Sequence, residues 1–110
     1  MSETTKNAGK NATKNQPKLV APERARMLKG FDMLADDIRH SILERLAQQP
    51  TNVSDLCAAL NEKQPSISHH LTLLKMAGIV DYSRDGKCNT YFIIKESLQE
   101  LARIVTALAK

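Results

Sequence analysis

The sequence predicts a mainly α-helical domain that carries one small β-hairpin. Apolar residues recur at steps of three and four through most of the chain, which is the spacing of one face of a helix. Two β-prone runs flank the pair Asp85–Gly86, and a helical pattern resumes after them. With 110 residues, 42% of them hydrophobic, the chain has room for one compact domain. We therefore expect four helices, a hairpin and a fifth helix, in that order.

Charge divides the chain into two unequal parts. The first 19 residues contain four lysines and one glutamate, so they account for +3 of the net charge of +4 and leave +1 for residues 20–110. Because the first segment has almost no apolar periodicity, residues 1–19 are predicted to be a disordered basic tail and residues 20–110 to fold. The tail is either a solvated arm or an arm that neutralises DNA phosphates.

The composition also indicates a cytoplasmic protein with no membrane partner. No apolar run approaches the roughly 18 residues that a membrane span requires, and the N-terminus lacks the apolar core of a secretory signal. Two cysteines are too few for a disulfide scaffold, and they fit a reducing compartment.

The first two helices are predicted from turn residues and apolar spacing. Pro22 suits the first turn of a helix whose apolar face comprises Met27, Leu28, Phe31 and Leu34. Asp36 or Asp37 can cap the second helix, which ends before Pro50. The apolar face of this second helix comprises Ile38, Ile42, Leu43 and Leu46.

Two shorter helices are predicted next, across a tight turn. The first is Val53–Leu60, with Thr51 or Asn52 as its cap. The second begins near Pro65 and stops at Gly78, a residue that accepts the left-handed conformation of a helix end. Its inward residues are Ile67, Leu71 and Leu74. Two short helices joined in this way form a helix-turn-helix.

The hairpin and the last helix complete the prediction. The β-prone runs Ile79–Arg84 and Lys87–Ile94 are joined by Asp85–Gly86, a dipeptide that suits a two-residue hairpin loop. A helix follows from about Lys95, and its apolar seam comprises Leu98, Leu101, Val105 and Leu108. An isolated helix would leave this seam in water, so we expect it to have a partner surface.

The helix that starts at Pro65 offers small polar side chains on the faces that its core residues leave free. These are Gln64, Ser66, Ser68, His69, Thr72 and Lys75. Such groups suit the major groove of DNA, because Gln and Ser hydrogen-bond base edges while Lys and His reach phosphates. Arg84 and Lys87 at the hairpin tip could hold flanking phosphates. The alternatives are an ordinary solvated helix face and a charged hairpin tip with no DNA partner.

Three stretches resemble the ArsR/SmtB-type repressors, which are small winged helix-turn-helix homodimers. They are LADDIRHSIL at 34–43, QPSISHHLTLLK at 64–75 followed by AGIV at 77–80, and RDGK at 84–87 with Tyr91. The resemblance spans Phe31–Ile94. It implies a dimer interface formed by the first and last helices. It also implies DNA contacts, in the major groove from Gln64, Ser66, Ser68 and His69, and in the wing from Arg84 and Lys87.

The metal sites of that family are not expected here. Asn52 and Ser54 stand where the family has a Cys-x-Cys pair, and residues 95–110 contain no His, Asp or Cys. Cys57 shares an apolar face with Leu56 and Leu60, so a buried, inert thiol is the favoured interpretation. A thiol switch that uses Cys57 and Cys88 is the alternative.

The histidines are also assigned no metal. His69 and His70 are adjacent and must point in different directions on a helix, so one is expected to face DNA and the other to join the core or a cap. His40 precedes Glu44 by one turn and is expected to be a helix-surface residue.

We therefore expect a repressor that binds a palindromic operator in double-stranded DNA as a homodimer, has no cofactor, and answers to an unidentified small-molecule or redox effector. Enzymatic activity is not expected, because the sequence has no Gly-rich phosphate loop, nucleophile elbow or metalloprotease His-Glu pair. Two rivals stay open. One is a protein-interaction module with the same fold, and the other is a regulator switched by oxidation of Cys57 and Cys88.

Overall fold

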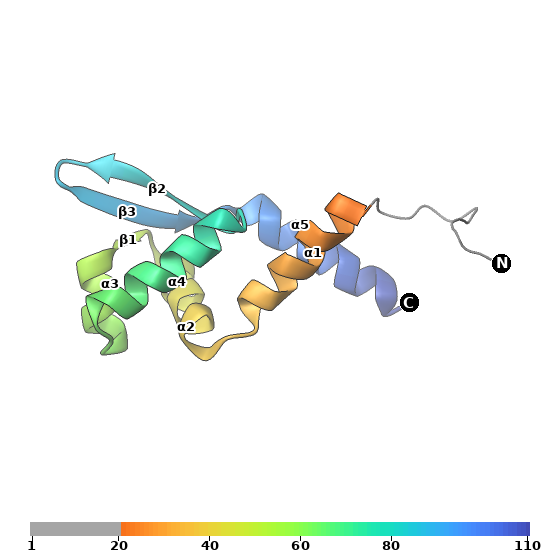
Figure 1. The fold of residues 1–110 in the computed structure, drawn as a ribbon, viewed down its shortest axis with the longest axis horizontal. Coiled ribbons are helices and arrows are strands. Elements are labelled where there is room, and N and C mark those ends of the chain that lie inside the picture. The colour runs from red at the N-terminus through yellow and green to blue at the C-terminus, as the bar shows by residue number, and fades with distance from the viewer. Residues whose placement is uncertain (1–20) are drawn as a thin grey trace.

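The computed structural model describes residues 21–110, which form five helices and a three-stranded antiparallel sheet (Figure 1). The elements are α1 (Ala21–Leu34), α2 (Asp37–Gln48), β1 (Thr51–Asn52), α3 (Val53–Leu60), α4 (Gln64–Met76), β2 (Val80–Asp85), β3 (Cys88–Ile93) and α5 (Lys95–Leu108). The predicted mainly helical fold with one hairpin is confirmed. The basic tail predicted for residues 1–19 lies outside the described residues.

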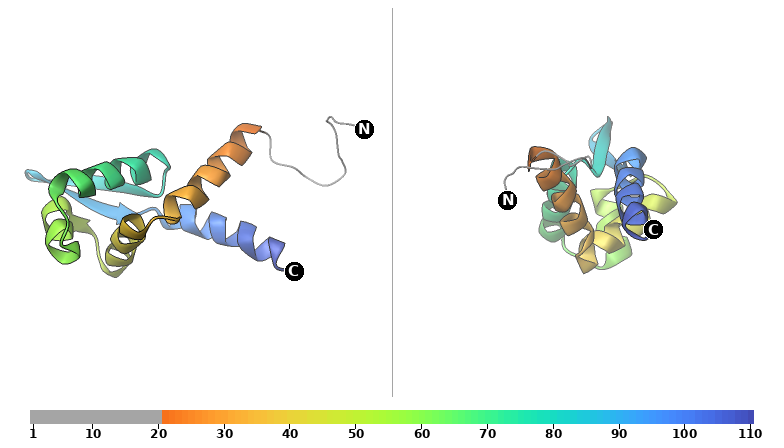
Figure 2. Two further views of the ribbon diagram at one scale, coloured as in Figure 1. Left: turned by 60° about the horizontal axis from the view of Figure 1, so that its bottom comes forward. Right: turned by 90° about the vertical axis from the view of Figure 1, so that its right-hand side faces the viewer.

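The described chain has a body and an extension. Helices α2, α3 and α4 pack with the sheet to form the body, while α1 and α5 project together from one end of it (Figures 1 and 2). The two projecting helices meet at Gly30, where a β-carbon would lie 3.2 Å from the side-chain methyl groups of Leu101. Gly30 therefore lets α1 and α5 approach closely.

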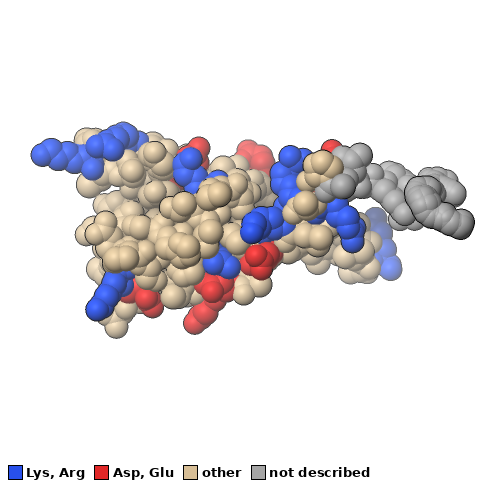
Figure 3. Space-filling view, in the orientation of Figure 1, with Lys and Arg blue, Asp and Glu red and all other residues tan. Residues whose placement is uncertain are grey.

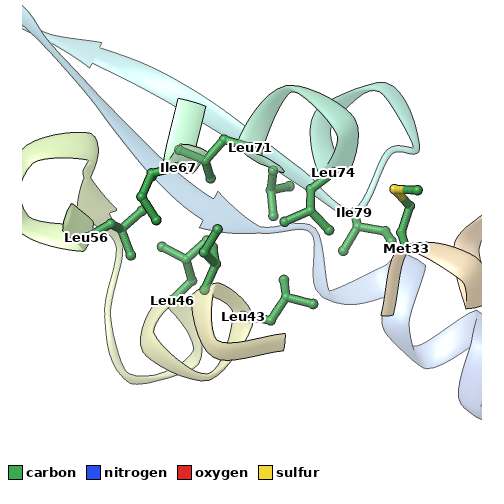
Figure 4. Close-up of a cluster of buried hydrophobic side chains, with 10 residues drawn as sticks. Met33, Leu43, Leu46, Leu56, Ile67, Leu71, Leu74 and Ile79 are labelled. Carbon is green, nitrogen blue, oxygen red and sulfur yellow. The ribbon is translucent and has the colours of Figure 1, made fainter. Parts of the chain in front are cut away.

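The hydrophobic core lies between α2, α4 and the sheet (Figure 4). The inward faces predicted for the second and fourth helices are buried in it, with Ile42, Leu43, Leu46, Ile67, Leu71 and Leu74 all nearly inaccessible to solvent. Leu56 of α3 joins them from the side, and Ile79 and Val80 join at the start of the hairpin. The core thus fixes α4 with one face inward and the rest of its surface free.

The apolar face predicted for the first helix is partly wrong. Leu28 is 50% exposed, whereas Met33 is buried in the core and Gly30 is buried against α5. Only the C-terminal end of α1 reaches the body, so the residue that enters the core is one near that end.

A third strand was not predicted. Thr51 and Asn52 form β1, which pairs with β3 through Thr51 opposite Tyr91 and Asn52 opposite Thr90. The predicted capping role is also present, because the Asn52 side chain accepts a hydrogen bond from the backbone N–H of Asp55 at 2.8 Å. The sheet order is β1-β3-β2, with the hairpin partner β3 in the middle.

The hairpin loop is Gly86–Lys87, not Asp85–Gly86 as predicted. Asp85 pairs with Cys88, so these two residues belong to the strands. Gly86 has a φ of 65°, and no positive φ occurs at Lys87, which fits the turn type that requires glycine at the first of its two central positions. Lys87 therefore stands in the loop itself.

Both predicted helix signals around α2 and α4 are confirmed. The carboxylate of Asp36 caps α2 by accepting from the backbone N–H of Arg39 at 3.0 Å. Gly78 has a φ of 77° just after α4, and the N–H groups of Gly78 and Ile79 donate to the carbonyls of Lys75 and Leu74. This pair of hydrogen bonds is a Schellman motif, which ends the helix and redirects the chain into the hairpin.

Candidate nucleic-acid interface

Helices α3 and α4 form a helix-turn-helix with a short connection. Asn61 ends α3 in the left-handed conformation, with a φ of 53°, and its N–H donates to the carbonyl of Cys57. Asparagine tolerates this conformation better than most residues. The chain then reaches α4 after Glu62 and Lys63, and the two helices contact each other.

The polar residues predicted on α4 all lie outside the core. Gln64, His69, Thr72 and Lys75 are exposed, while Ser66 and Ser68 are half-buried. The Thr72 hydroxyl donates to the carbonyl of Ser68 at 2.9 Å, so its proton is engaged within the helix and its lone pairs are left for a partner. Short side chains of this kind keep the helix slim enough for a groove about 12 Å wide.

The first turn of α4 presents backbone donors to solvent. The residue that precedes the helix, Lys63, makes no side-chain capping bond, and Pro65 stands in the first turn. Amide N–H groups at the start of a helix, together with its dipole, attract anions such as phosphate. The exposed ammonium of Lys63 adds a cation beside these amides. Sequence reasoning missed Lys63, although a lysine directly before a helix start is a readable signal.

The wing hairpin carries its basic residues at the tip. Arg84 and Lys87 are both exposed, and Figure 3 shows basic side chains gathered at this end of the molecule. The Arg84 Nε donates to the carbonyl of Gly86 at 3.3 Å, which holds the guanidinium over the turn. Arg84 and Lys87 are therefore placed together at one projecting point.

A row of contacting side chains joins the end of α4 to the wing. The Lys75 ammonium lies 5.6 Å from the centroid of the Tyr82 ring, and the Tyr82 ring lies 5.3 Å from that of Tyr91. Burial raises the pKa of the Tyr91 phenol, so this ring stays uncharged. A cation over an aromatic ring is attracted by the negative face of the ring. Tyr82, which the sequence did not single out, therefore positions Lys75.

The two adjacent histidines differ in exposure, as expected, but their rings lie close together, with centroids 5.5 Å apart. His69 is exposed on α4, whereas the side chain of His70 is only 15% exposed and faces the start of α2. The guanidinium of Arg39 donates to Nδ1 of His70 at 3.2 Å, and a carboxylate oxygen of Asp36 lies 3.9 Å from the same nitrogen. His70 therefore links α4 to Arg39 and Asp36 at the start of α2.

Arg39 and Asp36 extend this contact to the first helix. The Nε of Arg39 donates to the carbonyl of Met33 at 2.9 Å, at the end of α1. The backbone N–H of Arg39 lowers the pKa of the Asp36 carboxyl by donating to it. The recognition-helix candidate α4 is therefore tied through His70 to the junction of α1 and α2. His40 is separate from this cluster and lies 3.6 Å from Glu44 on the helix surface.

The two cysteines, predicted only as a possible switch, line one cavity of about 490 Å³. Cys57 on α3 is half-buried rather than fully buried, and Cys88 at the start of β3 is exposed. Gln64 and Lys87 line the same cavity, so the start of α4 and the tip of the wing are neighbours across it. Sequence spacing could not reveal this meeting of four residues from α3, α4, β3 and the hairpin loop.

Candidate metal ligands do not cluster within residues 21–110. Within that range no three His, Cys, Asp or Glu side chains gather closely enough to hold a metal ion. Asn52 and Ser54 line the cavity beside Cys57 with neutral side chains. None of the helices in the described range combines the length and the apolar character needed to cross a membrane.

Comparison with known proteins gives consistent results in sequence and structure. The profile described as "Bacterial regulatory protein, arsR family" matches residues 36–82. An uncharacterized HTH-type transcriptional regulator from Methanocaldococcus jannaschii is 37% identical over 79 residues, which cover 71% of this chain and 89% of that protein. A transcriptional repressor SmtB homolog from Synechocystis is 32% identical over 83 residues, which cover 74% of this chain and 62% of that protein.

A solved structure extends the match to the whole arrangement of helices and hairpin. The homodimeric winged helix-turn-helix DNA-binding domain from Mycobacterium bovis superposes with a TM-score of 0.69 at 28% identity, over 81% of this chain and 82% of that chain. The helix-turn-helix of α3 and α4 and the β2–β3 hairpin agree with a winged helix-turn-helix fold. The chain therefore belongs to the arsR family of bacterial regulatory proteins and has the winged helix-turn-helix fold of its transcription regulators.

Proposed function

We propose that this arsR-family protein is a repressor that binds an operator in duplex DNA as a homodimer. The observation that carries the proposal is the cavity shared by Gln64 and Lys87, because it makes the start of α4 and the tip of the wing adjacent. A helix in the major groove and a wing on the next phosphates need that adjacency. As a DNA-bound regulator, the protein would work in the cytoplasm.

Each polar residue of α4 and the wing has a role in this proposal. Gln64, Ser66, Ser68 and His69 read base edges, because they occupy the first two turns of α4 outside the core. Lys75, Arg84 and Lys87 hold phosphates, with Thr72 and Lys63 assisting along the backbone. The uncapped first turn of α4 adds amide donors for a phosphate.

The homodimer part of the proposal rests on α1 and α5. Apolar side chains on both helices are largely exposed to solvent, with Leu28 50%, Val105 49% and Leu108 83% exposed. Between the two helices lies an open cavity of about 510 Å³ whose lining includes Met27 and Ile104. A second copy would bury this surface, and burial of apolar area favours association. The similar Mycobacterium bovis domain is homodimeric.

Two-fold symmetry then sets the form of the operator. Two copies of α4 related by a two-fold axis would enter major grooves about one helical turn, or roughly 34 to 36 Å, apart. The operator would therefore be an imperfect palindrome.

Selection from a random pool of duplexes tests the proposal. The full-length protein is expected to enrich sequences with two inverted half-sites, and its affinity for them is expected to fall steeply as salt rises. Failure to retain any duplex at low salt, or enrichment of a single asymmetric half-site, would contradict the proposal. Salt-insensitive capture would point instead to an apolar protein interface.

A further inference from the structure

The cavity between α3, the start of α4 and the wing contains both cysteines of the chain. Cys57 comes from α3 and Cys88 from the first position of β3, and each is a free thiol. Gln64 and Lys87, which the proposed function assigns to DNA, line the same space. Chemistry at the two sulfurs therefore takes place within the part of the molecule that would face DNA.

The two thiols differ in accessibility in the way that a stepwise reaction needs. Cys88 is exposed, so its sulfur is the more accessible to a dissolved reagent, whereas Cys57 in the lining of the same cavity is half-buried. Reversible thiol oxidation in proteins commonly uses an accessible thiol that reacts first and a second thiol nearby that resolves the product.

The end of β3 that carries Cys88 has few restraints on its α3 side. Strand β1 pairs with β3 only through Tyr91 and Thr90, so Cys88 and Asn89 are paired with β2 alone. The amide oxygen of Asn89 is buried and has no hydrogen-bond donor within residues 21–110. Because this oxygen accepts no hydrogen bond, a rearrangement of the stretch breaks none at that atom. A buried acceptor without a partner is also unfavourable in the folded protein.

We propose that Cys57 and Cys88 form a reversible thiol–disulfide pair that regulates DNA binding, an inference that rests on the proposed function. The oxidant is a low-molecular-weight disulfide, RSSR. The thiolate of Cys88 attacks one sulfur of RSSR, forms a mixed disulfide and releases one RS⁻. The thiolate of Cys57 then attacks the sulfur of Cys88 and displaces the second RS⁻. Two protein thiols become one disulfide, RSSR becomes two RSH, and the two thiol protons end on the released thiols.

Closing this bond changes the proposed DNA-binding surface. A disulfide requires the α-carbons of its two cysteines to lie about 4.4 to 6.8 Å apart, so the bond fixes the start of β3 against α3. Lys87 precedes Cys88 directly and moves with it, while Gln64 stays with α4. The spacing between the wing and the start of α4 is then set by the bond, and DNA binding weakens.

Mass spectrometry tests the pair without any DNA. The reduced full-length protein is treated with glutathione disulfide, and the intact mass and the peptide map are recorded. Wild type is expected to lose two hydrogen atoms and to yield a Cys57–Cys88 peptide from a monomeric chain. Cys57→Ser is expected to keep a stable glutathione adduct on Cys88. Only mixed disulfides in wild type, or only bonds between chains, would overturn the pair.

Affinity for the selected duplex tests the regulation. Oxidised wild type is expected to bind about tenfold more weakly, within the 5- to 150-fold range typical of coupled sites, and dithiothreitol is expected to restore it. The Cys57→Ser, Cys88→Ser double variant is the matched control, and its affinity should not respond to glutathione disulfide. An intrachain bond with unchanged affinity would overturn the regulation. If reduced wild type binds no duplex, the proposed function fails, while the mass measurement still decides the thiol pair.

Discussion

Helices α4 and α5 carry similar apolar spacing but have different neighbours. In α4 the stripe of Ile67, Leu71 and Leu74 is buried in the core of its own chain. In α5 only the first half of the seam packs, through Leu98 and Leu101, and Val105 and Leu108 stay exposed. Apolar spacing therefore gives the face of a helix but not its partner, which is this chain for α4 and, under the proposed function, a second copy for α5.

Removing a side chain from the α4 stripe is expected to have the largest effect. Leu71→Ala should lower the free energy of unfolding by about 2 to 5 kcal/mol, because Leu71 is fully buried and the substitution leaves a cavity. Leu108→Ala is the matched change in α5, and it should alter the stability of the dilute, dissociated protein by less than about 0.5 kcal/mol. Urea unfolding at low protein concentration measures both. Equal losses of unfolding free energy in the two variants would contradict the claim that α4 packs in its own chain while the end of α5 does not.

A charge on the α5 seam is expected to break the dimer and leave the fold intact. Leu108→Asp should raise the dimer dissociation constant by roughly tenfold to a hundredfold, or about 1.4 to 2.7 kcal/mol, because a buried carboxylate loses hydration. Sedimentation equilibrium measures the constant, and far-UV circular dichroism should stay unchanged. A variant that dimerises as well as wild type would place the interface elsewhere.

Truncation of the free face of α4 is expected to weaken specific DNA binding. Gln64→Ala should cost about 1 to 3 kcal/mol on the selected duplex and almost nothing on random duplex, because only base contacts discriminate sequences. Gln48→Ala, an exposed glutamine at the end of α2, is the control. Fluorescence anisotropy with both duplexes gives the values. An equal loss on random DNA would refute base reading by Gln64.

The wing is expected to behave differently from α4 in the same assay. Lys87→Ala should weaken binding to both duplexes alike and reduce the slope of log affinity against log salt by about one, because one phosphate contact is lost. Titrations at several salt concentrations measure the slope. A change confined to the selected duplex would instead make Lys87 a base-reading residue.

The smallest expected effect is a loss of stability in acid, through protonation of the Asp36 carboxylate at the start of α2. The pKa of Asp36 is lowered in the folded protein by the Arg39 backbone N–H, so its contribution to stability is complete above the ordinary aspartate pKa of about 3.9. The contribution is lost as the pH falls through the lowered folded value. Asp36→Asn keeps a capping side chain but does not titrate. As the pH falls below about 5, the free energy of unfolding of wild type should decrease more than that of Asp36→Asn. Equal decreases in the two proteins would contradict a stabilising role for the Asp36 carboxylate.

Much of the body could be predicted from sequence because the patterns that specify its helices each lie within a short stretch of the chain. The inward residues of α2 and α4, the Asp36 cap and the Gly78 stop each follow from short-range patterns, and all are found where expected. Leu28 was predicted to face inward but is half exposed, and the buried Met33 was not predicted, because apolar spacing alone does not say which end of α1 reaches the core. The hairpin loop was misplaced by one residue because Asp-Gly and Gly-X pairs both suit a two-residue loop.

Features that depend on distant pairing could not be predicted. A two-residue strand such as β1 has no periodicity, so its pairing with β3 leaves no trace in sequence. That pairing helps to place the start of α3 beside the hairpin, where Cys57 and Cys88 line one cavity. The contact between Arg39 and His70 likewise joins residues of α2 and α4 that no motif relates.

Footprinting of the full-length protein on a selected duplex tests the central claim most directly, namely that two copies of α4 read DNA together. Two protected half-sites of inverted sequence are expected, with centres about 10 to 10.5 base pairs or a multiple of this apart, and both should be lost together in Leu108→Asp. Protection of one half-site at saturation by wild type would contradict it.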